Sequence, residues 1–329
     1  MIFQPPALAL LLAASLNALA LAAAGAFAFH LLRHWRPDQG SEQQIALERR
    51  TYLVSTLVGL SLVLSLPALA LFVHTTDAIA PFFTGAMCAV GSLKANAWGL
   101  PALYAMLAGF FVAAAWLVLN HLDNQGWDMP LIRTKYRLLL GLAPLDLAQA
   151  VLSWAYFLDL EPQVITSCCG SLFGPAATGA AAELAALPLG LAAPIFVATL
   201  ALTLAAGLAF LLRGRFGGGF ALLAGLHFPV TLGAVVAFIA PYIYEQPNHH
   251  CPFCLLQAEH GYAGWVLYPP LFLGTAAALG VGLATRVHAQ SLARAAPALA
   301  GRLARVAMAS LSFFALAVAV YIGRSNLVM

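Results

Sequence analysis

The chain has 329 residues, of which 62% are hydrophobic and 8% charged, and its formal net charge is +3. A soluble domain carries about 25% charged residues, so this composition excludes a soluble globular protein. It predicts an all-α, polytopic integral membrane protein whose main solvent is membrane lipid.

Eight apolar runs are each long enough to cross a hydrocarbon core of about 30 Å as a helix. Helices satisfy every backbone hydrogen bond within one segment, which lipid requires. In chain order the predicted transmembrane helices are 6–31, 52–73, 100–120, 137–158, 183–212, 220–244, 262–284 and 306–323. We expect them to form a single transmembrane domain over residues 1–329. The sequence lacks a phosphate-binding glycine motif, so an ATPase is not expected, and nucleic acid is not an expected partner.

The distribution of basic residues predicts the orientation of the chain. If the N-terminus lies outside, only Lys94 and Arg324 of the 15 basic residues fall on the outer side. The other 13 lie on the inner side, as the positive-inside rule requires: Arg33, Arg36, Arg49, Arg50, Arg133, Lys135, Arg137, Arg213, Arg215, Arg286, Arg294, Arg302 and Arg305. Both termini are therefore expected outside, and we expect a bacterial inner membrane with the outer loops in the periplasm.

All five cysteines fall in the three predicted outer loops, 74–98, 159–183 and 245–262. They are Cys88, Cys168, Cys169, Cys251 and Cys254. Disulfides form and persist in the oxidising periplasm, so one interpretation is that disulfides staple the loops. The other interpretations assign the sulfur atoms a chemical role.

The segment "NHHCPFCLLQ" contains a Cys-x-x-Cys pair, Cys251 and Cys254. We expect Cys254 to open the following helix, whose N-terminus would stabilise a thiolate there. Pro252 suits a first helical turn. Protonated His249 and His250 would favour thiolate, or the imidazoles would carry protons. This pattern predicts thiol–disulfide chemistry.

The residues "CPFCLLQ" (251–257) resemble the Cys-Pro-x-Cys-x-x-Gln segment of the bacterial disulfide-bond-formation protein B family. Vitamin K epoxide reductase-like proteins do related chemistry. The resemblance implies a membrane oxidoreductase that passes electrons from a periplasmic thioredoxin-like protein to quinone. It implies that Cys251 and Cys254 are the quinone-proximal pair, with Cys168, Cys169 and Cys88 as candidates for the second pair. The chain departs from the family pattern at Ala258, where an arginine is common.

The same residues predict a soft-metal site as an alternative. Thiolate and thioether ligands select Cu(I), and thiolate with imidazole suits Zn(II). The candidate ligands are Cys88, Cys168, Cys169, Cys251, Cys254, His249 and His250, with Met87 alongside. Such a site would bind, deliver or transport copper or zinc, together with a metal-carrying protein. A third interpretation is a structural subunit that joins other membrane subunits in an export or respiratory complex.

Three polar residues fall inside predicted transmembrane helices: Asp146, Gln149 and His227. Ionisable groups at such depth face a bundle interior and suggest a pathway. Alternatively, Asp146 lies near the inner boundary, Gln149 makes an interhelical hydrogen bond, and His227 is a hydrogen-bonded core residue.

Overall fold

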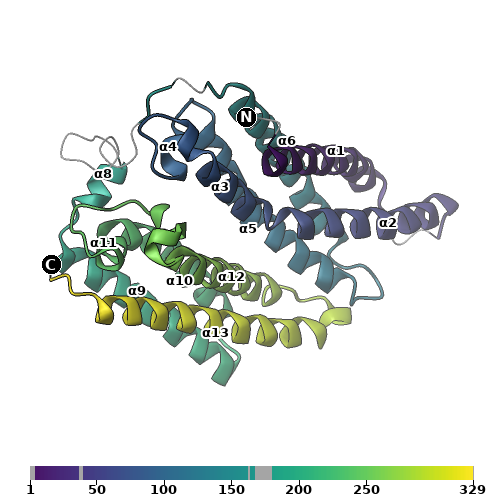
Figure 1. Cartoon of the computed structure of the whole chain (residues 1–329). Coiled ribbons are helices and arrows are strands. Elements are labelled where there is room, and N and C mark those ends of the chain that lie inside the picture. The colour runs from purple at the N-terminus through teal and green to yellow at the C-terminus, as the bar shows by residue number, and fades with distance from the viewer. Residues whose placement is uncertain (1–3, 37–39, 162–163, 167–179, 329) are drawn as a thin grey trace. The chain divides into compact units, whose positions relative to one another are not determined.

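A computed structural model of the chain describes residues 4–36, 40–161, 164–166 and 180–328 (Figure 1). Within these ranges the chain forms helices and turns, and the one extended pairing is an isolated parallel bridge between Thr84 and Ile165. The prediction of an all-α protein is confirmed.

Eight spans among the described residues are long and apolar enough to cross a membrane, which confirms the predicted number. The first four are α1 (Pro5–His34), α2 with α3 and η1 (Glu42–Phe82), α5 (Gly99–Asp123) and α6 (Ile132–Leu158). The last four are α9 (Leu189–Arg213), α10 with η2 and α11 (Gly217–Tyr244), α12 (Ala263–Ala284) and α13 (Ala295–Arg324). The chain is therefore an integral membrane protein.

Two spans begin ten or more residues earlier than the apolar runs predict, at Glu42 rather than 52 and at Ala295 rather than 306. Helix α2 (Glu42–Ser65) begins at a polar residue because the Ser41 hydroxyl accepts a hydrogen bond from the Gln44 amide, at 3.3 Å. This cap provides an acceptor for one of the first-turn backbone N–H groups, which have no partner within the helix. Pro67, which has no N–H to donate, separates α2 from α3 (Ala68–Ala78). Helix α13 begins at Ala295 because the alanine-rich segment before residue 306 continues the helix.

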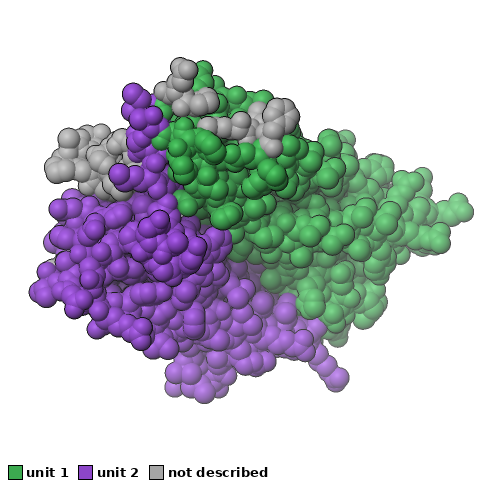
Figure 2. Space-filling model, viewed as in Figure 1, with its two compact units in different colours: residues 1–83, 92–164, 289–293 green, residues 84–91, 165–288, 294–329 purple. Residues whose placement is uncertain are grey.

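The described chain divides into two compact units, which are coloured separately in Figure 2. Unit 1 comprises residues 1–83, 92–164 and 289–293, and unit 2 comprises residues 84–91, 165–288 and 294–329. The first four spans belong to unit 1 and the last four to unit 2. The short segment 84–91 belongs to unit 2 although it precedes the third span. The single domain expected from the sequence stays a prediction.

Unit 1 is built on helix α6, which packs against α1 and α5 (Figure 1). Its core contains the buried rings of Trp116 and Tyr136. It also contains a buried ion pair, in which Lys135 Nζ lies 2.7 Å from Asp123 Oδ2. The Trp116 indole donates to the Lys135 carbonyl at 3.1 Å, so this charged pair is held inside a packed interior.

Unit 2 is built on α10 (Gly217–Ala234) and α12, which pack against each other, with α9 against α10 and α13 against α12. Small residues allow the close approach of the helices. A Cβ added to Gly282 would lie 2.5 Å from the Cβ of Ala221, so larger residues do not fit between α12 and α10. At its C-terminal end, α10 continues directly into the π-helix η2 (Val235–Ile239) and then into α11 (Ala240–Tyr244).

Large apolar side chains lie exposed along the spans, among them Leu16, Leu19, Leu64, Leu212 and Leu222. Soluble proteins rarely expose so much apolar surface to water. Lipid contact accounts for it, which confirms membrane lipids as a partner of the chain.

Candidate thiol and metal centre

Three of the five cysteines come together in unit 2. Cys88 precedes the short helix α4 (Ala89–Leu93), and Cys251 and Cys254 lie in the connection between α11 and α12. The three Sγ atoms all lie within 4.8 Å of one another. Cys168 and Cys169 lie outside the described residues.

The Sγ atoms of Cys88 and Cys251 lie 3.5 Å apart. A disulfide bond is about 2.0 Å long, so these two residues are thiols in this structure. The side chains of Cys88 and Cys251 are 0% exposed and that of Cys254 is 3% exposed. The centre is therefore a buried group of three sulfur atoms.

The expected helix N-terminus at Cys254 is wrong. Cys254 begins the three-residue 3-10 helix η3 (Cys254–Leu256), and the transmembrane helix α12 begins only at Ala263. Pro252 lies in the turn before η3, outside any helix. The dipole of a long helix therefore does not stabilise a thiolate at Cys254. The sequence pattern failed here because a second 3-10 helix, η4 (Ala258–His260), and left-handed Gly261 and Tyr262 separate the pair from α12.

Two tyrosine hydroxyls fix the backbone of the Cys-x-x-Cys turn. Tyr244 at the end of α11 donates to the Cys251 carbonyl at 2.6 Å. Tyr268 on α12 donates to the Pro252 carbonyl at 2.5 Å. Because both tyrosines sit on membrane-spanning helices, these hydrogen bonds hold the turn in a defined position.

The Cys88 segment is tied to this turn and to its neighbours in unit 2. The Gln257 side chain donates to the Met87 carbonyl at 2.8 Å. The Thr166 amide donates to the Thr84 carbonyl at 2.8 Å. Gly85 has a φ of +87°, and a Cβ there would lie 2.1 Å from the Thr166 carbonyl oxygen, so glycine is required at this crossing.

The two histidines before the pair have an aromatic ring and a backbone carbonyl among their partners. The His249 ring stacks on Tyr244, with centroids 4.1 Å apart, and His250 Nδ1 donates to the Val236 carbonyl at 2.8 Å. Val236 lies in the π-helix, a feature that often occurs at functional sites. The structure thus brings together Cys88, Cys251 and Cys254, and a ligand role for His249 and His250 stays a prediction. Met87 is 75% exposed, in contrast to the buried thiols.

His260 lies beside His249 and the ring of Tyr244. Partial burial lowers the pKa of His260, the nearby His249 lowers it further, and Glu259 opposes the shift. The neutral imidazole is therefore favoured at this position near the thiol centre.

His227 is a polar residue within a membrane span, and threonine hydroxyl groups are its hydrogen-bond partners. His227 is fully buried, with Nδ1 2.9 Å from the Thr199 hydroxyl and Nε2 3.0 Å from the Thr231 hydroxyl. Since Thr199 donates its own proton to the Phe196 carbonyl, His227 Nδ1–H donates to Thr199, and Thr231 donates to Nε2. Both ring nitrogens are satisfied, which fits the structural interpretation of His227.

Comparisons of the chain with models of known protein families, with curated proteins and with solved structures found no match.

Several residues of the site have no recognisable signature in the sequence. Nothing marks Tyr244 and Tyr268 as partners of the Cys-x-x-Cys turn, since aromatic residues are common near membrane boundaries. Gln257 was visible only as part of the "CPFCLLQ" resemblance, and its amide in fact contacts the Met87 carbonyl. The π-helix at 235–239 has no sequence signature beyond a run of apolar residues.

Proposed function

We propose that the chain binds a soft metal ion, Cu(I) in the first place, at Cys88, Cys251 and Cys254. The observation that carries the proposal is that three buried sulfur atoms lie within 4.8 Å of one another. Three sulfurs that share an ion at about 2.3 Å in one plane lie about 4.0 Å apart. The separations between sulfur atoms therefore need to change by less than about 1 Å to reach that geometry.

The ligand set favours copper over zinc. Thiolates select Cu(I), which is satisfied by two or three sulfur ligands, whereas Zn(II) takes four ligands in structural sites. The described residues supply three sulfurs to this group. Zinc would need a fourth ligand, for which His249, His250, Cys168 and Cys169 are the candidates named by the sequence.

Burial supports a bound cation as well. Thiolates removed from water are costly unless a positive charge compensates them. Metal binding releases the thiol protons and places that charge at the centre of the group. Burial at the same time hinders direct attack on these sulfurs by a thiol of another protein, because exchange requires access.

The side of the membrane follows from the spans and the basic residues. If all eight spans cross, the connections after the second and sixth spans lie on the same side as the N-terminus. The positive-inside rule supports placing this side outside, which is the periplasm if the membrane is a bacterial inner membrane. The proposed role is capture of a soft metal from, or delivery to, a metal-carrying protein outside the membrane.

The test is metal binding by the purified full chain in detergent or nanodiscs, kept reduced. Wild type is titrated with Cu(I) and with Zn(II) against a competing chelator, and bound metal is counted after gel filtration. We expect one Cu(I) per chain, lost in Cys88→Ser, Cys251→Ser and Cys254→Ser. The matched control is Met87→Leu, adjacent to Cys88 but exposed, which should bind normally. Copper retained by the triple serine variant would overturn the proposal.

A second candidate function is thiol–disulfide chemistry, which the 3.5 Å separation of Cys88 and Cys251 supports. Two thiols would lose two electrons and two protons to form a disulfide, and a quinone would accept both to become a quinol. The resemblance of "CPFCLLQ" to a quinone-linked family favours this acceptor. Alkylation of all thiols in intact membranes, followed by mass spectrometry, tests the idea. A disulfide that forms with added quinone and disappears with reductant supports it, and alkylated thiols under both conditions exclude it.

A further inference from the structure

A buried carboxyl group in unit 1 lies near the middle of a transmembrane helix. Asp146 belongs to α6 (Ile132–Leu158) and is 7% exposed. Three turns or more of helix extend on both sides of it, which favours a position inside the membrane over one at the inner boundary. A charged group at such depth is strongly disfavoured.

Only one oxygen of this carboxyl group has a hydrogen-bond partner within the described part of the chain. Asp146 Oδ1 accepts a hydrogen bond from Asn17 Nδ2 at 2.6 Å. Asn17 is oriented by Ser61, whose hydroxyl donates to Asn17 Oδ1. Asp146 Oδ2 is buried without a partner among the described residues. Buried polar atoms are nearly always satisfied, so such an atom calls for a ligand.

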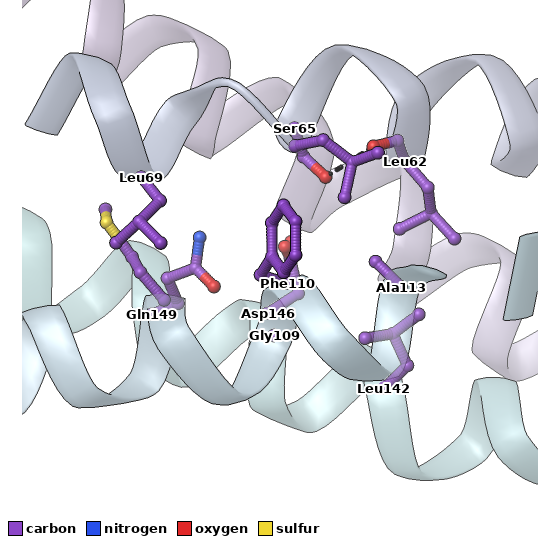
Figure 3. Close-up of a pocket in the computed structure, with 11 residues that line it drawn as sticks. Leu62, Ser65, Leu69, Gly109, Phe110, Ala113, Leu142, Asp146 and Gln149 are labelled. Carbon is purple, nitrogen blue, oxygen red and sulfur yellow. Dashed lines mark hydrogen bonds between the residues drawn. The ribbon is translucent and has the colours of Figure 1, made fainter. Parts of the chain in front are cut away.

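A small cavity adjoins the carboxyl group (Figure 3). Its volume is about 10 Å³, close to the roughly 10–15 Å³ that one water needs. Its polar lining is Asp146, Gln149 and Ser65. The Ser65 hydroxyl donates to the Leu62 carbonyl at 2.9 Å, so its oxygen remains able to accept.

No basic side chain lines the cavity to balance an ionised carboxylate. Asp146 is the one titratable side chain among the residues that line it. Helix α1 presents Asn17, α2 presents Ser61 and Ser65, and the remaining lining residues are apolar apart from Gln149. The basic residues of α6, Arg133, Lys135 and Arg137, all lie in its first two turns, and Lys135 pairs with Asp123. Because no basic side chain lines the cavity, Asp146 avoids an uncompensated buried charge only when its carboxyl group is protonated.

We propose that Asp146 is a proton-binding site in the membrane core of unit 1, which exchanges its Oδ2 proton with a water in the adjoining cavity. The acid O–H bond breaks on release, the carboxylate keeps the electron pair, and the water carries the proton away as hydronium. Asn17 stabilises the carboxylate left behind through its bond to Oδ1. This site is independent of the cysteine centre, and each can fail without the other.

Dicyclohexylcarbodiimide, an apolar reagent that modifies protonated carboxyl groups, tests the proposal on the full chain in nanodiscs. We expect modification at Asp146, located by peptide mass, with a rate that falls about tenfold per pH unit once the carboxyl ionises. Asp146→Asn should lose this label. Asp159, which is exposed, is the matched control and should react with a water-soluble carbodiimide that does not reach Asp146.

Added sodium or lithium distinguishes a proton site from a cation site. Equal labelling rates with and without these ions support proton binding, and protection by either ion would overturn it in favour of an alkali cation. A labelling rate that does not change between mildly acidic and alkaline pH would also overturn it, since the carboxyl would then be a permanently protonated structural group. Infrared difference spectra after a pH jump give a second readout: the acid C=O band should appear in wild type and disappear in Asp146→Asn.

The neighbouring glycine supplies a variant that retains the carboxyl group. A Cβ on Gly109 would lie 2.8 Å from Gln149 Oε1, so Gly109→Ala must displace the Gln149 side chain in the cavity. We expect slower proton exchange at Asp146 in this variant, by several-fold in the carbodiimide rate at a fixed pH. An unchanged rate would contradict exchange through the cavity.

Discussion

Cys88 and Cys251 are 163 residues apart in the sequence, yet their Sγ atoms lie 3.5 Å apart in unit 2. The short segment 84–91 brings Cys88 into the unit that otherwise consists of the second half of the chain. Cys254 completes the group because the Cys-x-x-Cys turn is pinned by two tyrosine hydroxyls. The buried group of three sulfur atoms arises from this long-range convergence rather than from the local pair alone.

Proximity of Cys88 and Cys251 predicts a specific cross-link. In a variant with Cys254, Cys168 and Cys169 replaced by serine, mild oxidation should join the remaining two cysteines, since closure needs a movement of about 1.5 Å to reach the disulfide length of about 2.0 Å. Peptide mass spectrometry measures the product. A control variant moves the first cysteine, as Cys88→Ser with Ser92→Cys, and should form little cross-link. Equal yields from both variants would argue against the observed packing.

The Tyr244 hydroxyl should stabilise both the fold and the metal site. Tyr244→Phe leaves the Cys251 carbonyl without its donor at 2.6 Å, which costs about 1–3 kcal/mol for a buried polar group. We expect a lower unfolding midpoint and weaker Cu(I) binding, measured by thermal unfolding and chelator competition. Tyr242→Phe, two residues away on the same helix, is the matched control and should leave both measurements near wild type.

Acid should destabilise the region around His260. Its pKa is lowered in the folded chain by partial burial and by His249, so the folded state binds the proton less well than the unfolded state. The stabilisation is fully present above the unfolded pKa of about 6.5 and is lost as the pH falls through the folded value. The unfolding temperature should therefore drop on acidification, and the drop should shrink in His260→Gln and, to a smaller extent, in His249→Gln. An acid response identical in all three proteins would assign it to other groups.

Breaking the buried ion pair of unit 1 should be severe. Lys135→Met leaves the Asp123 carboxylate buried without its partner at 2.7 Å, which typically costs about 3–5 kcal/mol. The double variant Lys135→Met with Asp123→Asn removes the uncompensated charge and keeps an oxygen to accept from the Leu131 amide. Denaturant unfolding should show much of the lost stability restored in the double variant. A double variant no more stable than the single one would show that the pair acts through packing alone.

The membrane spans were predictable because lipid imposes a requirement on every crossing segment. Runs such as 100–120 and 137–158 must be predominantly apolar, and they lie within α5 and α6. Helix ends were less predictable. The Ser41 cap extends α2 into polar residues, and the alanine-rich start of α13 extends that helix, since neither feature depends on lipid.

The sequence predicted that cysteines form the site, but not how they are arranged in it. Placement of the cysteines in outer loops indicated that sulfur atoms gather on one side, and three of them do come together. Which cysteines lie next to each other could not be predicted, because Cys88 contacts Cys251 through tertiary packing of the segment 84–91. The expected helix start at Cys254 was wrong because periodicity cannot distinguish the 3-10 turns at 254–260 from the first turn of a long apolar helix.

X-ray absorption at the copper edge of the Cu(I)-loaded protein tests the central claim most directly. Coordination by Cys88, Cys251 and Cys254 predicts a first shell of sulfur at about 2.3 Å, judged from thiolate–metal distances, with the sulfur count falling in each single serine variant. A first shell of nitrogen or oxygen, or a sulfur shell unchanged when all three cysteines are replaced, would contradict it.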